Sequence, residues 1–257
     1  MGMDIYAGTL TRYYAQNWKT AAQQFAEENG WGYQRIVPEG ASPEEGEALS
    51  PAEIQADMEQ WRDWLLKALT PEGREVYASW PEDNERPYYT DKPDWDGFGA
   101  LLLYAAAGKL AEPLPPTVEK GWDFNDHPLI SAMREQEGKA WSLFSGATCW
   151  LPMEDGFYFT GPMPNGNQAV IGTSAALRAE LDAINGQGWQ ADEETILSWT
   201  RTEGYPADGS IQKDGSLTVE KQHTEYPTES LAKYAFSIFW RALRFSEEHK
   251  VPILMDY

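Results

Sequence analysis

The sequence has little cysteine, little histidine and no long apolar run. Its 257 residues include one cysteine, Cys149, which excludes a disulfide within the chain. The three histidines form neither an HxH nor an HExxH pattern, so no metal site is predicted. The longest apolar run, Ala100 to Ala107, has eight residues and is too short to cross a bilayer. The start MGMDIYAGTL lacks the basic and apolar regions of a signal peptide. We therefore expect a cytoplasmic protein that does not bind membranes.

Motifs for cofactor binding and for nucleophilic catalysis are also missing. No glycine-rich phosphate loop follows a predicted strand, and no GxSxG motif is present. Cys149 lies in the apolar stretch GATCWLP, which is typical of a buried and unreactive thiol. We expect no cofactor and predict no catalytic residue, which favours a protein that is not an enzyme. The paired carboxylates of a glycosidase stay open as an alternative, because the chain has 41 acidic residues.

Positive charge is the scarcer sign in this chain. The sequence carries 41 Asp and Glu against 20 Lys and Arg, a formal net charge of −21, together with 12 Trp. The aromatic content argues against a disordered acidic tail, and the charge argues against binding to nucleic acid. The segment 26–96 holds 18 acidic and 6 basic residues, so the excess is concentrated there. It is interpreted either as a solvated outer layer or as a patch for a basic partner.

Helical and strand patterns alternate irregularly along the chain, which predicts an α+β fold. We expect one domain over residues 1–257, with a mixed or antiparallel sheet, several packed helices and a subdomain boundary near 112–117, where EPLPPT stands. Ser50 and Glu53 form a capping box that starts a helix with Pro51 at its first position. The other expected elements include strands at 4–14, 33–37 and 140–151, helices at 17–28, 96–110 and 228–250, and a hairpin turn at 213–216.

The C-terminal region gives the second clear pattern. Apolar residues cover two faces of the helix expected over 228–250, so we predict that this helix is buried. The sequence VPILMDY then forms a continuous apolar run, which is typical of a strand in the centre of a sheet.

Arg12 is the first candidate for binding a ligand. Strict alternation over 4–14 places it on one strand face with Tyr6 and Tyr14. A guanidinium on a core face requires a partner, either a carboxylate in an ion pair or an anionic ligand in a cleft lined by the tyrosines. Both interpretations stay open at this stage.

Asp94 and Trp95 form the second candidate, within the stretch DKPDWDG. Several carboxylates beside an aromatic ring suit a sugar or a divalent ion, but the spacing does not match a calcium loop. The simpler interpretation is that an acidic residue here caps the buried helix that follows.

Two functions from different classes remain. The preferred one is a non-enzymatic interaction protein, of the inhibitor or immunity type, that binds a basic protein through its acidic surface. The alternative is a small-molecule enzyme or binder that recognises an anionic group through Arg12. The sequence predicts no oligomeric state.

Overall fold

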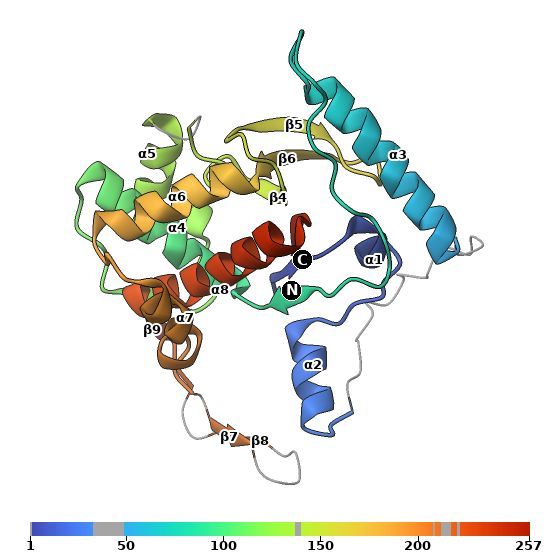
Figure 1. The fold of residues 1–257 in the computed structure, drawn as a ribbon. Coiled ribbons are helices and arrows are strands. Elements are labelled where there is room, and N and C mark those ends of the chain that lie inside the picture. Colours follow the sequence, from blue (N-terminus) through green and yellow to red (C-terminus); the bar gives the residue numbers. More distant parts are fainter. Residues whose placement is uncertain (1, 33–48, 137–139, 208, 212–216, 220–221) are drawn as a thin grey trace.

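A computed structural model describes residues 2–32, 49–136, 140–207, 209–211, 217–219 and 222–257. In these ranges the chain forms an α+β fold, in which a mixed six-stranded sheet carries helices on both faces (Figure 1). The predicted fold class is confirmed.

The six strands have the order β2-β1-β10-β4-β6-β5. Neighbours are antiparallel except for β4 and β6, which run parallel. β10 lies between β1 and β4, which confirms the predicted central position of the C-terminal strand. The strand bounds are β1 Asp4–Ala7, β2 Tyr89–Asp91, β4 Ala147–Leu151, β5 Tyr158–Pro162, β6 Gln168–Thr173 and β10 Ile253–Asp256.

The first face of the sheet is covered by α4 (Asp94–Leu110) and α8 (Thr228–His249), which pack against each other. Both helices bury most of their apolar residues, so the predicted burial of the C-terminal helix is confirmed. Burying one large apolar side chain stabilises a fold by roughly 1.5–3 kcal/mol. Around this pair lie α5 (Pro128–Gln136), α6 (Ser174–Gln187) and α7 (Glu193–Thr202).

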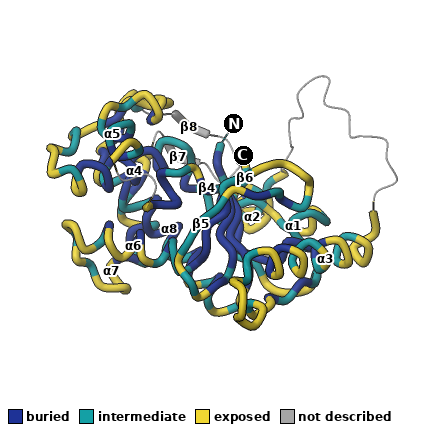
Figure 2. The backbone as a smooth tube through the Cα atoms, turned by 90° about the horizontal axis from the view of Figure 1, so that it is seen from above, coloured by how far each residue is buried: buried dark blue, intermediate teal, exposed yellow. Residues whose placement is uncertain are grey.

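The second face is covered by α1 (Leu10–Tyr14), α3 (Pro51–Leu69) and an extended segment, residues 71–88, which we call the strap. Trp61 of α3 donates its indole N–H to the Pro162 carbonyl oxygen at 2.9 Å, which fixes the helix to β5. Met58 and Leu65 are buried beneath the helix, while its other side is exposed (Figure 2). α2 (Ala21–Glu28) follows α1 in the chain.

Two small sheets lie outside the main one. β3 (Thr117–Glu119) pairs with β9 (Glu225–Pro227), and β7 (Gly209–Ile211) pairs with β8 (Leu217–Val219). A short 3-10 helix, η1 (Phe124–Asp126), precedes α5. Residues 112–117 connect α4 to β3. The strand expected at 33–37 and the turn expected at 213–216 lie outside the described residues.

The strand predicted over residues 4–14 is wrong beyond Ala7. The chain leaves the sheet at Gly8, whose N–H donates to the Pro252 carbonyl, and α1 begins at Leu10. Thr9 is the N-cap of this helix, because its hydroxyl accepts from the Arg12 N–H. Arg12 therefore lies on a helix and does not share a strand face with Tyr6.

The strand predicted over 140–151 is also too long. Only Ala147–Leu151 forms β4, and residues 142–146 form turns. The Glu180 carboxylate of α6 accepts hydrogen bonds from the N–H groups of Ser142 and Leu143. These donors are bound by a side chain, so they cannot pair with a neighbouring strand.

The helix starts depend on capping residues. The predicted box of Ser50 and Glu53 is present at the start of α3. α2 begins at Ala21 and not at Asn17, because Thr20 and Gln23 form a second capping box. Within the described ranges, none of the helices combines the length and the hydrophobicity that a membrane span requires.

Candidate functional site

Arg12 is tied to main-chain oxygens. Its Nε donates to the Asn17 carbonyl at 2.6 Å, and its Nη1 donates to the Arg86 carbonyl. The guanidinium also stacks over the Tyr88 ring, 4.6 Å from the ring centre. No carboxylate of the described residues forms an ion pair with it, so Arg12 is held in place while its charge is not neutralised.

Tyr6 and Tyr14 do not line the hollow beside Arg12, which is formed by Trp18, Lys19 and Tyr88 with other residues. Tyr6 is fully buried and donates its hydroxyl to the Thr9 carbonyl at 3.0 Å. Its ring stacks on Tyr88, so it supports the ring on which Arg12 rests. Burial raises the pKa of Tyr14 to about 12. The structure therefore brings Arg12 together with Tyr88, which the sequence pattern missed.

Asp94 and Trp95 lie apart from Arg12, at the start of α4. The Asp94 carboxylate accepts from the Trp95 N–H at 3.0 Å and lies 4.0 Å from the Lys92 ammonium. The Trp95 ring stacks on Phe124 in the apolar core and meets Tyr257 edge-on. An acidic residue in the first helical turn is favoured by the helix dipole. The capping interpretation is nevertheless wrong: the N-cap residue is Pro93, no side chain caps α4, and the carboxylate of Asp96, within the first turn, accepts from the Gly121 N–H at 3.1 Å.

Asp4 and Asp256 face each other across β1 and β10. Asp4 Oδ1 is buried without a hydrogen-bond partner, whereas Asp256 accepts from the Tyr13 hydroxyl at 2.6 Å. Burial raises the pKa of Asp4, and the repulsion from Asp256 adds to this, while Lys92 at 4.0 Å opposes it. The described residues contain no cluster of three metal ligands.

Replacing Asp4 with asparagine is expected to raise the midpoint of thermal unfolding at about pH 7.5. The pKa of Asp4 is raised in the folded state above its ordinary value of 3.8. The stability that the protonated Asp4 contributes is therefore fully present at pH values below 3.8. This stability is lost as the pH rises through the folded-state pKa of Asp4. The increase in unfolding midpoint on replacing Asp4 with asparagine should therefore shrink as the pH is lowered toward about 4. Asp182→Asn on exposed α6 is the control, and a lower midpoint for Asp4→Asn at neutral pH would contradict the sign.

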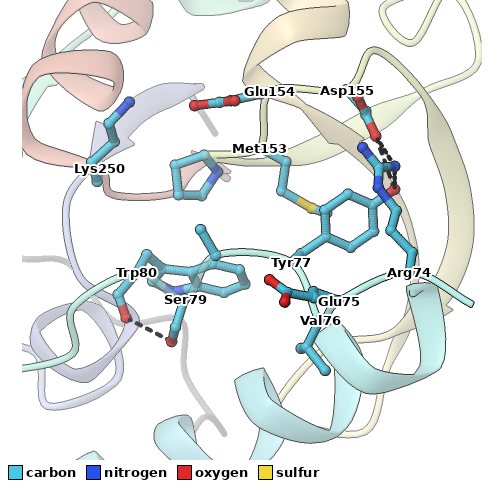
Figure 3. Close-up of a pocket in the computed structure, with 12 residues that line it drawn as sticks. Arg74, Glu75, Val76, Tyr77, Ser79, Trp80, Met153, Glu154, Asp155 and Lys250 are labelled. Atoms are coloured by element: carbon cyan, nitrogen blue, oxygen red, sulfur yellow. Dashed lines mark hydrogen bonds and ion pairs between the residues drawn. The ribbon is translucent and has the colours of Figure 1, made fainter. Parts of the chain in front are cut away.

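A separate cleft lies where β4 ends. One wall is the strap, residues 74–80, and the other is the connection 152–155 between β4 and β5 (Figure 3). Lys250, directly after α8, closes one side. The cleft has a volume of about 370 Å³, in the range of small-molecule sites. Its floor contains the buried side chains of Trp80 and Met153.

The charged residues that line the cleft are Arg74, Glu75, Glu154, Asp155 and Lys250. At one end, Asp155 Oδ2 accepts from Arg74 at 2.7 Å and from the Tyr77 hydroxyl at 3.1 Å. These two hydrogen bonds lower the pKa of Asp155, so this end is ionised and internally paired. At the other end lie Lys250 and Glu154, and in Figure 3 the Glu154 carboxylate extends toward Lys250. No ion pair between them falls within 4.0 Å, and neither is paired with any other described residue.

α3 carries several of the exposed acidic residues of the segment 26–96. Glu53, Asp57, Gln60 and Trp64 recur at helical spacing along the side of the helix that faces solvent. Trp64 is 51 % exposed. Not every acidic residue of the segment 26–96 reaches the surface, since Glu82 of the strap is buried. Four residues thus define what we call the α3 face.

Comparisons with family models, with curated proteins and with solved structures find no match to this chain. The site is therefore argued from its residues alone. Sequence reasoning missed the cleft because its walls come from segments about 80 and 170 residues apart along the chain. The one local signal was a lysine at the end of α8, a position where glycine is common.

Proposed function

We propose that this protein is a non-catalytic, cytoplasmic interaction protein that binds a basic partner protein through the α3 face. The observation that carries the proposal is Trp64, a large aromatic side chain left 51 % exposed on a helix face that also carries Glu53 and Asp57. Tryptophan is enriched among the residues that dominate binding energy at protein interfaces. The exposed ring supplies affinity, and the surrounding carboxylates select a partner of positive charge.

The electrostatics support the same class of partner. A net charge of −21 repels nucleic acid and anionic lipid surfaces, so neither is proposed as a ligand. It attracts cationic proteins and accelerates their association at low ionic strength. Glu72 and Glu75 of the strap continue the acidic exposed surface beyond the end of α3.

Replacing Trp64 with alanine is expected to weaken partner binding by about tenfold or more, because an interface aromatic contributes roughly 2 kcal/mol. The tagged protein would capture partners at about 50 mM salt, and affinities of the captured basic protein would be measured by calorimetry. Phe25→Ala on α2 is the matched control, since Phe25 is equally exposed, at 50 %, but lies on another helix. Failure to recover any basic protein whose binding depends on Trp64 would overturn the proposal.

Recognition of an anionic group through Arg12 is the second proposal, supported by the absence of a carboxylate partner among the described residues. Arg12→Ala is expected to lower the free energy of unfolding by about 1–2 kcal/mol, because hydrogen bonds to main-chain carbonyls are lost. Denaturant unfolding measures this loss. Phosphate binding, measured by calorimetry on the same variant, should be lost as well, and a loss of stability with unchanged phosphate binding would show that Arg12 has only a structural role.

A further inference from the structure

Lys250 adopts a backbone conformation that does not favour lysine. Its φ of 54° and ψ of 52° place it in the left-handed region directly after α8, a position where glycine is the usual residue. Its N–H donates to the Ser246 carbonyl, and the Ser246 hydroxyl donates to the Val251 carbonyl at 2.5 Å. The turn is therefore fixed, and Lys250 lies at the edge of the cleft with its ammonium group on the same side as the Glu154 carboxylate (Figure 3).

This cation has no acidic partner within 4.0 Å among the described residues. The nearby Glu247 is already paired with Arg178, which takes both of its carboxylate oxygens. Glu154 lies at the same mouth of the cleft and is exposed and unpaired. Lys250 and Glu154 are too far apart to form an ion pair with each other. Glu75 of the strap is a further exposed carboxylate in the lining of the cleft and forms no ion pair with a described residue.

The floor between the charged mouth and the paired end is apolar. Trp80 and Met153 are buried there, and the Tyr77 ring lies between them and Arg74 (Figure 3). The Trp80 ring is only 2 % exposed and its indole N–H is bonded to Glu82, so the accessible apolar surface of the cleft comes mainly from other lining residues, such as Val76 and Ala78. A cavity of about 370 Å³ with this floor suits one large apolar side chain.

We propose that the cleft binds a free α-amino acid with an aromatic or large aliphatic side chain. Lys250 pairs with the α-carboxylate of the ligand, Glu154 pairs with its α-ammonium group, and the side chain lies against the apolar lining of the cleft. A zwitterion has no net charge, so the overall charge of −21 does not repel it as it would an anion. This site is separate from the α3 face and does not depend on the proposed partner.

Three ligands that share a phenyl ring test the assignment by calorimetry on the full chain. L-phenylalanine carries both charges, 3-phenylpropionate only the carboxylate, and phenethylamine only the ammonium group. We expect phenylalanine to bind at least about tenfold more tightly than either of the others. Equal binding of all three would show a merely apolar site, and no binding of phenylalanine or leucine would also overturn the proposal.

Two variants assign the charges. Lys250→Gly is expected to raise the midpoint of thermal unfolding, because glycine suits the left-handed backbone, and yet to weaken phenylalanine binding about tenfold or more. The same variant should leave phenethylamine binding unchanged. Glu154→Gln should weaken the binding of phenylalanine and phenethylamine but leave the binding of 3-phenylpropionate unchanged.

Lys67→Gly, on the exposed side of α3, is the control for the loss of a positive charge. A Lys250→Gly protein that still binds phenylalanine with full affinity would refute the site.

Discussion

Replacing Glu82 with alanine is expected to lower the free energy of unfolding by about 3 kcal/mol or more. The carboxylate is only 5 % exposed and accepts four hydrogen bonds. The donors are the N–H groups of Leu10 and Thr11, the Thr11 hydroxyl and the Trp80 indole. Removal of the carboxylate leaves these donors without a partner at the start of α1. Chemical denaturation with urea measures the loss.

Glu82→Gln separates the contribution of the charge from that of the hydrogen bonds. Burial raises the pKa of Glu82, so the desolvation of the carboxylate outweighs the hydrogen bonds that favour its ionised form. A neutral amide avoids that cost but can accept at only one of its two positions. We expect it to lose about half as much stability as alanine. Glu85→Ala, an exposed residue of the same strap, should change little, and an equal loss at both positions would contradict a special role for Glu82.

Glu180 performs the same task on the other face of the sheet. It is also 5 % exposed, and burial raises its pKa although it accepts from Ser142 and Leu143. In both places a buried glutamate binds the N–H groups of a segment that follows or precedes a strand. Neither Glu82 nor Glu180 forms an ion pair with a cationic side chain among the described residues. Main-chain donors therefore take the place of the ion pair that a buried carboxylate otherwise requires.

These two glutamates explain where the sequence predicted too much strand. Alternation of side chains was present over residues 4–14, and residues 140–151 were also predicted as a strand, but the N–H groups that would extend each strand are bound elsewhere. Glu82 lies 71 residues from Thr11, and Glu180 lies 38 residues from Ser142. Periodicity reports which side chains are apolar and carries no information about such distant acceptors. Signals between residues close in sequence predicted the structure correctly, as the capping box at the start of α3 shows.

The candidate functional surfaces also differ in whether short-range sequence patterns could predict them. The acidic face of α3 could be predicted from one helix, because its pattern of Ile54, Met58, Trp61 and Leu65 left the opposite side to solvent. The cleft could not, since Tyr77, Glu154 and Lys250 meet only after β4, the strap and α8 have been placed. Arg12 was predicted to lie on a strand face and to meet a carboxylate or an anionic ligand, but it lies on a helix. Its partners are carbonyls, which every residue has and no sequence pattern marks.

Phe239→Ala is expected to cost about 3–5 kcal/mol of unfolding free energy, the range for removing a buried aromatic ring. Phe239 of α8 is fully buried, stacks on Phe98 of α4 and meets Trp150 of β4 edge-on. It therefore contacts both helices of the first face and a central strand at once. Urea denaturation measures the effect, and Phe25→Ala at an exposed position should stay within about 0.5 kcal/mol of the parent.

The same variant tests whether the two faces unfold together. β4 contributes Trp150 to the first face and Cys149 and Leu151 to the second, so the two cores share one strand. Because loss of the Phe239 ring weakens the support of that strand, we expect amides of α8 and β10 that exchange by global opening to lose equal protection. Amides of α3 that exchange by global opening should lose the same amount of protection. Protection that falls in α8 but not in α3 would show that the second face, with the α3 surface proposed to bind a partner, opens and closes as a separate unit.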